Sequence, residues 1–227
     1  MHKLEKIAEE IRQAFDAQTA ARDEALTHAR ALTHACALSI RAVHRDEADV
    51  MQAHLEEARQ LAATLRSELA VFPALFHAGY TQDALKEFAE ANITCALIRS
   101  EPLPTPQELN LLPATYLNGL AEAVGEMRRR CLDMLRQDHS DEAERLLTHM
   151  DDIYSILVTM DYPDAITNGL RRQTDVIRAI LERTRGDLTF SLRGEKLERS
   201  LHRLAGQLPG AVELPEQHNL TLPPEEE

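Results

Sequence analysis

The chain has 227 residues, of which 44% are apolar and 28% charged, and its formal net charge is −13. This is the composition of a soluble globular protein that can bury a sizeable core, and an aromatic content of only 4% argues against an extensive β-sheet. The acidic balance excludes a generally basic nucleic-acid-binding surface, but not a local basic lining, because salt screens electrostatic fields beyond about 10 Å.

The first predicted helix is more than forty residues long. From the N-terminus onward, apolar residues recur three and four positions apart, as they do on one face of a helix. The beginning of this stripe consists of Leu4, Ile7, Ile11 and Phe15. The same spacing continues to Val43, so we expect one uninterrupted helix to that point.

Two further helices are predicted before the first break in the pattern. The second covers residues 47–71 and ends before Pro73, because proline cannot continue a helix. The third covers residues 81–100, and Thr81 is its expected N-cap.

A proline-rich segment, EPLPTPQELNLLP, interrupts the helices at residues 101–113. Within it, Thr105 and Glu108 have the spacing of a capping box, in which each side chain accepts a hydrogen bond from the other residue's backbone N–H. Pro106 suits the first position of a helix. We therefore expect one short helical turn inside this segment.

Four helices are predicted after the break. Their approximate ranges are 116–136, 140–162, 164–185 and 188–208, with Ser140 as a cap and Gly186 between the last two. From Pro209 the chain is rich in proline and glutamate, so residues 209–227 are predicted to form a disordered acidic tail. The expected fold class is all-α: a single-domain bundle of about six or seven helices over residues 1–208.

Two of the predicted helices carry pairs of acidic residues at helical spacing. Glu87 and Glu90 are three positions apart, on a side that becomes apolar over residues 94–98 and so is expected to face protein or a cavity. Glu122 and Glu126 are four positions apart, opposite the apolar stripe of their helix. Carboxylate oxygens are the ligands that Mg²⁺ and Mn²⁺ prefer. Taken alone, each pair is more typical of a solvated helix surface than of a metal site, because glutamate is a strong helix former.

Two segments resemble the translin family. They are LKEFAEA at residues 85–91 and YLNGLAEAVGEMRRRCLDMLR at residues 116–136, and they are most similar to the translin-associated factor X branch. A third segment, LERTRGDLTFSLRGEKLE at residues 181–198, resembles the prokaryotic members. The similarity extends from about Phe72 to Glu198. The factor X branch is a metal-dependent endoribonuclease, whereas translin itself binds nucleic acid without the full acidic set.

The resemblance extends to the acidic residues of the catalytic branch. Glu87 and Glu90 match its Glu-aromatic-x-Glu motif, and Glu122 and Glu126 match a second motif in which the animal proteins have Asp at the position of Glu122. The resemblance therefore implies a four-carboxylate site for Mg²⁺ or Mn²⁺, with all four residues as metal ligands and catalytic groups. It also implies RNA or single-stranded DNA as the partner, and a homo-oligomer, which in the family is an octameric barrel.

Outside the acidic pairs, the candidates for a chemical role are an arginine, a histidine and three cysteines. Arg129 lies on the face of the second acidic pair and is expected to bind a substrate phosphate, although a salt bridge to a neighbouring carboxylate fits its position equally well. His77 is expected to be a surface residue. Three cysteines, Cys36, Cys95 and Cys131, lie inside helical patterns and predict free thiols in a reducing cytoplasm. No membrane span and no signal peptide are expected, because no sufficiently long apolar run is present.

Three functions follow from these observations. The first is a metal-dependent endoribonuclease, and the alternative is a non-catalytic assembly protein that binds RNA or single-stranded DNA. A third is a carboxylate-bridged di-iron or di-manganese bundle, but such sites usually carry Glu-x-x-His pairs. Neither acidic helix has a histidine three residues after a glutamate. The presence of all four acids favours the endoribonuclease.

Overall fold

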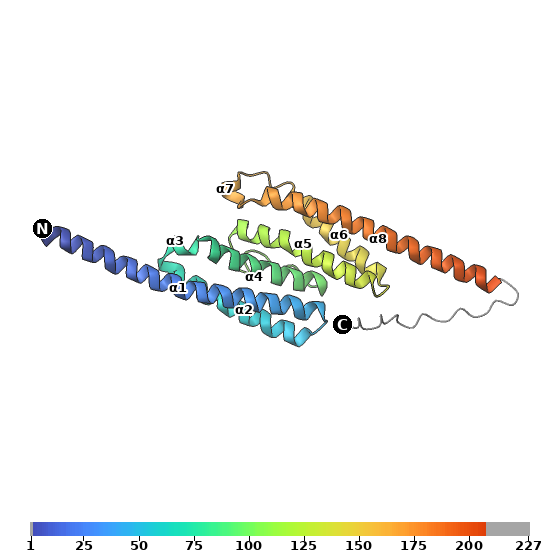
Figure 1. Ribbon diagram of the computed structural model, residues 1–227, viewed down its shortest axis with the longest axis horizontal. Helices are drawn as coiled ribbons and strands as arrows, with labels where there is room; N and C mark the ends of the chain where they lie inside the picture. Colours follow the sequence, from blue (N-terminus) through green and yellow to red (C-terminus); the bar gives the residue numbers. More distant parts are fainter. Residues whose placement is uncertain (1, 208–227) are drawn as a thin grey trace, which may run out of the picture. The chain divides into compact units, whose positions relative to one another are not determined.

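The computed structural model describes residues 2–207, and every regular element within that range is helical (Figure 1). The elements are α1 (His2–His44), α2 (Ala48–Glu68), the 3₁₀ helix η1 (Leu69–Val71), α3 (Pro73–Phe76), α4 (Gly79–Ile98), α5 (Pro113–Leu135), α6 (Ser140–Leu157), α7 (Asp164–Thr167) and α8 (Leu170–Gln207). The predicted all-α fold is confirmed, with six long helices and three single-turn elements among the described residues. The tail predicted for residues 209–227 lies outside that range.

The chain divides into two units, Met1–Leu188 and Thr189–Glu227, with the boundary inside α8. The first unit contains all elements from α1 to α7 and the beginning of α8. The second contains the remainder of α8. The predicted extent of the domain, residues 1–208, stays a prediction.

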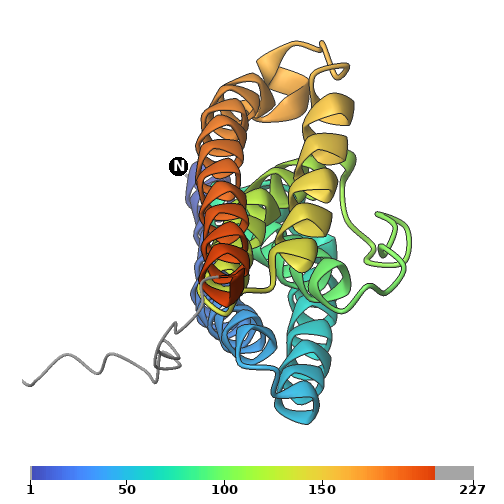
Figure 2. The ribbon, with the colours of Figure 1, turned by 90° about the vertical axis from the view of Figure 1, so that its right-hand side faces the viewer.

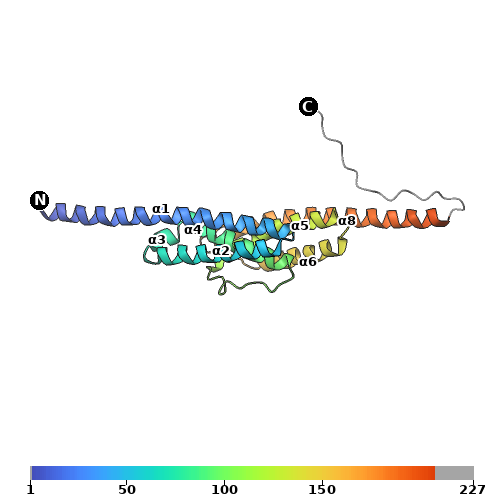
Figure 3. The same cartoon turned by 90° about the horizontal axis from the view of Figure 1, so that it is seen from below.

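The core of the first unit lies between α1, α4 and α5. α1 packs against α2, α4 packs against both α1 and α5, and α5 packs in turn against α6 (Figures 2 and 3). Large side chains such as Leu32, Phe88 and Met127 are fully buried between these helices. α4 is therefore the central helix of the unit, and almost all of its last eleven residues are buried.

The capping box at the proline-rich segment is confirmed. The backbone N–H of Thr105 donates to Oε2 of Glu108 at 2.7 Å, and the N–H of Glu108 donates to Oγ1 of Thr105 at 3.2 Å. The predicted helical turn is present as a single turn: the N–H of Leu109 donates to the carbonyl oxygen of Thr105 at 3.1 Å, and Asn110 ends the turn in a left-handed conformation.

Two predicted helix starts are wrong. α4 begins at Gly79 with Ala78 as its N-cap, and the predicted cap Thr81 is buried inside the helix, where its hydroxyl donates to the carbonyl of Leu75. α6 begins at Ser140 itself, and the residue at the cap position is His139. In both cases the chain before the helix already turns, so the helix starts earlier than the polar residue suggested.

The predicted break at Gly186 is also wrong, because α8 continues through it. A single glycine costs a helix about 1 kcal/mol relative to alanine, which neighbouring turns can offset. The chain instead turns at Asn168 and Gly169, whose φ angles are 52° and 82°. Asn and Gly are the residue types that adopt this left-handed conformation at least cost.

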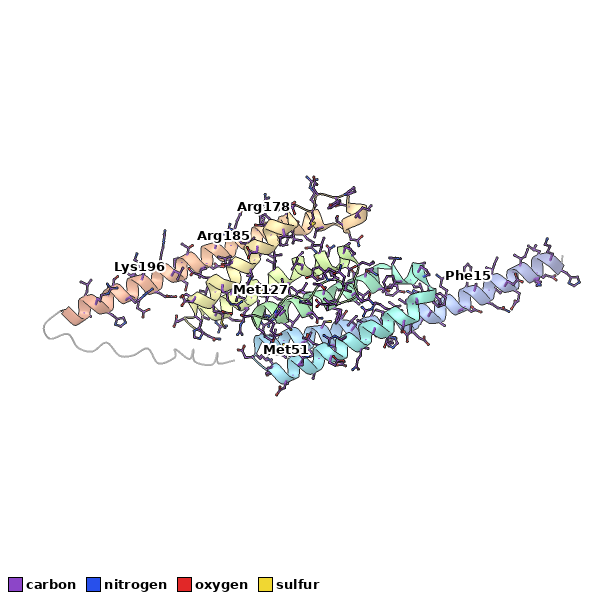
Figure 4. The ribbon with its side chains drawn as sticks, turned by 180° about the vertical axis from the view of Figure 1, so that it is seen from behind. Phe15, Met51, Met127, Arg178, Arg185 and Lys196 are labelled. Carbon is purple, nitrogen blue, oxygen red and sulfur yellow. The ribbon has the colours of Figure 1, made fainter. Side chains whose placement is uncertain are left out.

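The beginning of α1 extends past the other helices of the first unit. None of the residues from His2 to Glu24 is buried, and the first buried residue is Ala25. Phe15 lies on this extended part, whereas Met51 and Met127 lie within the helix packing (Figure 4). The beginning of the predicted apolar stripe, from Leu4 to Phe15, is therefore exposed in the described chain. None of the described helices has a stretch apolar enough to cross a bilayer.

Candidate metal centre

The two acidic helices touch each other backbone to backbone. A Cβ atom placed on Gly119 of α5 would lie 2.5 Å from Cβ of Ala89 and 2.8 Å from the carbonyl oxygen of Lys86, both in α4. Only glycine allows so close an approach. The crossing brings the side chains that flank it, on both helices, into one site.

Three carboxylates meet beside this crossing. Glu87 and Glu90 of α4 and Glu122 of α5 each offer an oxygen, and these oxygens all lie within 4.8 Å of one another. All three side chains are partly buried. The structure thus brings together three of the four acids predicted from the sequence.

The cluster is short of positive charge. Burial, together with the charges of Glu87, Glu122 and Glu126, raises the pKa of Glu90 to about 8. Burial also raises the pKa of Glu87, although the nearby ammonium of Lys86 opposes this. Raised pKa values are the expected result when several carboxylates gather in a partly buried site with fewer positive charges than negative ones.

The fourth acid, Glu126, has partners of its own. Its Oε2 accepts a hydrogen bond from Nε2 of His44 at 2.6 Å and lies 3.4 Å from Nη1 of Arg129. The hydrogen bond from His44 lowers the pKa of Glu126 despite partial burial. Glu126 is therefore held as a carboxylate next to the cluster, close enough to raise the pKa of Glu90.

Sequence reasoning missed His44. It is the last residue of α1, 82 positions before Glu126, and its side chain is only 3% exposed. No spacing rule connects two residues so far apart. The available signal was weak: a histidine at the end of a helix whose preceding residues, Ala42 and Val43, are apolar.

Lys86 was missed as well. Its Nζ donates to Oε1 of Glu122 at 2.7 Å and lies 3.9 Å from Oε1 of Glu87. Burial alone would lower the pKa of Lys86, but the hydrogen bond and charge of Glu122 outweigh it, so the pKa is raised. Gln173 of α8 also donates to Oε1 of Glu122, at 3.3 Å. Glu122 is thus fixed by two donors from two other helices.

Comparison with known proteins places the chain among close structural relatives. It is 35% identical over 185 residues to the uncharacterized protein MJ0175 of Methanocaldococcus jannaschii, across 81% of this chain and 82% of that protein. It matches AfC3PO in complex with duplex RNA with a TM-score of 0.77 and 31% identity, covering 82% of this chain and 97% of the other. The chain belongs to the C3PO (translin) family.

Two further comparisons agree with this assignment to the C3PO family. The structure of AfC3PO determined without RNA gives a TM-score of 0.76 at 30% identity, over 82% of this chain and 97% of that one. Apo-NeC3PO gives 0.75 at 18% identity, over 81% and 96%, and this likeness shows the fold alone. No family model matches the chain. The resemblance to the translin family inferred from residues 72–198 is confirmed.

The other residues singled out in the sequence, an arginine, a histidine and three cysteines, lie outside the acidic cluster. Arg129 is mostly exposed, with the salt bridge to Glu126 as its observed contact, so binding of a phosphate stays a prediction. His77 is exposed and packs edge-on against Phe76. The predicted free thiols are confirmed, and all three are buried: Cys36, Cys95 and Cys131.

Proposed function

We propose that the protein is a Mg²⁺- or Mn²⁺-dependent endoribonuclease of the translin-associated factor X type. The observation that carries this proposal is the cluster of Glu87, Glu90 and Glu122 at the crossing of α4 and α5. Its donor atoms fit such a cation, since they are hard oxygens, lie within 4.8 Å of one another and share a partly buried site in which three carboxylates face one ammonium, that of Lys86. The chemistry that the cation supplies is polarisation of the scissile phosphate and activation of a water molecule.

Each acid has a distinct place in this proposal. Glu87, Glu90 and Glu122 would hold the cation, with Gln173 fixing the orientation of Glu122. Glu126 would be the fourth acid of the site. The hydrogen bond from His44 keeps Glu126 ionised and oriented at the edge of the cluster.

RNA is the proposed substrate. The relative AfC3PO has been crystallised with duplex RNA, and the two chains are 31% identical over the region that matches. A chain with a net charge of −13 must bind RNA through local cations. Arg129 is exposed and stands 3.4 Å from Glu126, so we assign it a contact with an RNA phosphate.

The test is cleavage of end-labelled single-stranded and duplex RNA with Mn²⁺, with Mg²⁺, or with EDTA. The parent protein should cut RNA with either metal and not with EDTA, and Glu90→Gln should lose at least about a hundredfold in rate, as expected when a metal ligand is removed. Glu144→Gln, an exposed glutamate of α6, is the matched control and should cut normally. Binding of RNA without cleavage under all conditions would instead support the non-catalytic alternative.

A further inference from the structure

The acidic cluster is the one place in the helix packing where this chain uses a lysine. The sequence contains 25 lysine and arginine residues, and only four of them are lysines: Lys3, Lys6, Lys86 and Lys196. Between Ala25 and Leu188, the ion pairs of the described residues are made by arginine or histidine, except those of Lys86. The use of lysine in place of arginine beside Glu87 and Glu122 therefore needs a chemical explanation.

Lysine and arginine hold carboxylates in different ways. A guanidinium binds both oxygens of a carboxylate in a rigid, planar fork, whereas an ammonium is a compact charge on a flexible stem. Arg130, which binds both oxygens of Asp46, shows the first mode in this chain. Lys86 shows the second, with a single hydrogen bond to one oxygen of Glu122. Because Lys86 is held by one hydrogen bond on a flexible stem, its ammonium can move away from Glu122.

The position of Lys86 conflicts with a metal ion in the cluster. Its Nζ is 2.7 Å from a carboxylate oxygen of Glu122 and 3.9 Å from one of Glu87. A divalent ion would sit about 2.1 Å from the same carboxylates. The ammonium and the ion would then lie within a few ångströms of each other and repel strongly in a partly buried site.

We propose that Lys86 is the resident cation of the acidic cluster, which a divalent metal ion displaces from Glu122, and that Lys86 thereby limits the metal affinity of the site. The inference rests on the proposed metal-binding function. The side chain of Lys86 is 21% exposed, so its four-carbon stem has a path to solvent. Gln173 keeps its hydrogen bond to Glu122 when the ammonium leaves, so the carboxylate stays oriented for the metal.

The test measures metal affinity without RNA. Mn²⁺ is titrated under argon at pH 8.5, and the electron paramagnetic resonance signal of free Mn²⁺ reports binding. Lys86→Met keeps the length of the stem and removes the charge, so it should bind Mn²⁺ about tenfold more tightly than the parent. Lys86→Arg should bind Mn²⁺ several-fold more weakly, because a guanidinium can hold both oxygens of Glu122. Lys6→Met, an exposed lysine of α1, is the matched control and should not change the affinity.

The outcomes separate this inference from the proposed function. If Lys86→Met keeps the parent's helical circular-dichroism spectrum but binds Mn²⁺ no more tightly than the parent, the proposed role of Lys86 is wrong. Binding of Mn²⁺ by the parent would in that case still support the metal site. If neither the parent nor Lys86→Met binds Mn²⁺, both proposals fail. If Lys86→Met does not fold, Lys86→Arg decides the question, since affinity equal to or above that of the parent contradicts displacement.

Discussion

Glu90 is the carboxyl group of the described residues whose ionisation the fold opposes most strongly. Burial and three neighbouring carboxylates raise its pKa from 4.5 to about 8. A carboxyl group with a higher pKa in the folded chain than in the unfolded chain binds its proton more tightly when folded. Its contribution to stability is therefore most favourable below the unfolded pKa and is lost as the pH rises towards 8.

Removing this charge should stabilise the metal-free protein. We predict that Glu90→Gln raises the free energy of unfolding by about 2 kcal/mol at pH 8.5, and that the gain shrinks towards pH 5. Urea unfolding in EDTA, followed by circular dichroism at both pH values, measures it. Glu144→Gln, exposed on α6, should change neither value. A gain equal at both pH values would mean that the charge of Glu90 is not what destabilises the fold.

His44 and Glu126 should stabilise the fold as a pair. A double-mutant cycle with His44→Ala and Glu126→Ala should give a coupling energy of about 1–3 kcal/mol at pH 7, since each single change leaves a partly buried polar group without its partner. The folded pKa of Glu126 is lowered, so its contribution is present above 4.5 and is lost as the pH falls through the folded pKa. The cycle is measured by urea unfolding from pH 7 downward. If the two single substitutions change the free energy of unfolding additively at pH 7, the 2.6 Å contact between His44 and Glu126 makes no net contribution to stability.

Arg129 should contribute to RNA affinity but not to metal binding. Arg129→Ala should weaken RNA binding and reduce the slope of log K against log salt by about one, because one phosphate contact is lost. Fluorescence anisotropy at several salt concentrations, in EDTA so that no cleavage occurs, measures both effects. Arg199→Ala, an exposed arginine of α8, is the control. Parent-like binding by Arg129→Ala would place the RNA-binding surface elsewhere.

At the scale of helices, the site depends on one close crossing. Gly119 lets α5 approach α4 until its Cα faces Ala89, and this contact places the acids of the two helices beside each other. A methyl group there would lie 2.8 Å from a backbone oxygen and 3.0 Å from a backbone nitrogen of α4, and backbone atoms cannot move aside alone. Any substitution at Gly119 must therefore separate the two helices.

We predict that Gly119→Ala lowers the free energy of unfolding by about 1–3 kcal/mol and weakens Mn²⁺ binding, because overpacking moves α4 away from Glu122. Gly125→Ala is the matched control on the same helix. A Cβ there meets nothing within 4 Å, so this change should be neutral or stabilise by up to about 1 kcal/mol. Urea unfolding and Mn²⁺ titration measure both variants. Equal behaviour of the two variants would show that the crossing does not position the site.

The helices and the acidic pairs were predictable because both depend on local spacing. The pattern of residues 81–100 and 116–136 gave α4 and α5 to within three residues at either end, and about 100° per residue placed Glu87 beside Glu90. Lys86 and His44 were not predictable, because each gains its role only from a helix far away in the sequence. The helix break predicted at Gly186 was wrong for a related reason, because whether a glycine ends a helix depends on the packing around it.

At the scale of the whole molecule, two apolar stripes lie uncovered within their own units. In the first unit, Leu4 is 71% and Phe15 is 63% exposed on α1. In the second unit, the large apolar residues of α8 that are exposed are Phe190, Leu197, Leu201 and Leu204. A helix segment without packing partners is marginally stable in water, and contiguous exposed apolar residues mark interaction sites. The stripe of α1 is therefore a candidate contact between copies of the chain, in keeping with the homo-oligomer that the family resemblance implies.

We predict that the protein self-associates through this stripe of α1. Replacing Ile11 and Phe15 together by lysine puts two charges into the apolar contact, and burying them unpaired would cost several kcal/mol. Multi-angle light scattering after gel filtration should then show a lower mass than for the parent, approaching the 25.5 kDa of one chain. The control variant, Gln13→Lys with Asp16→Lys, adds two lysines at exposed positions between and beside the stripe residues and should keep the parent's mass. A parent that elutes as a single chain contradicts self-association, and an unchanged mass of the Ile11 and Phe15 variant assigns the contact to another surface.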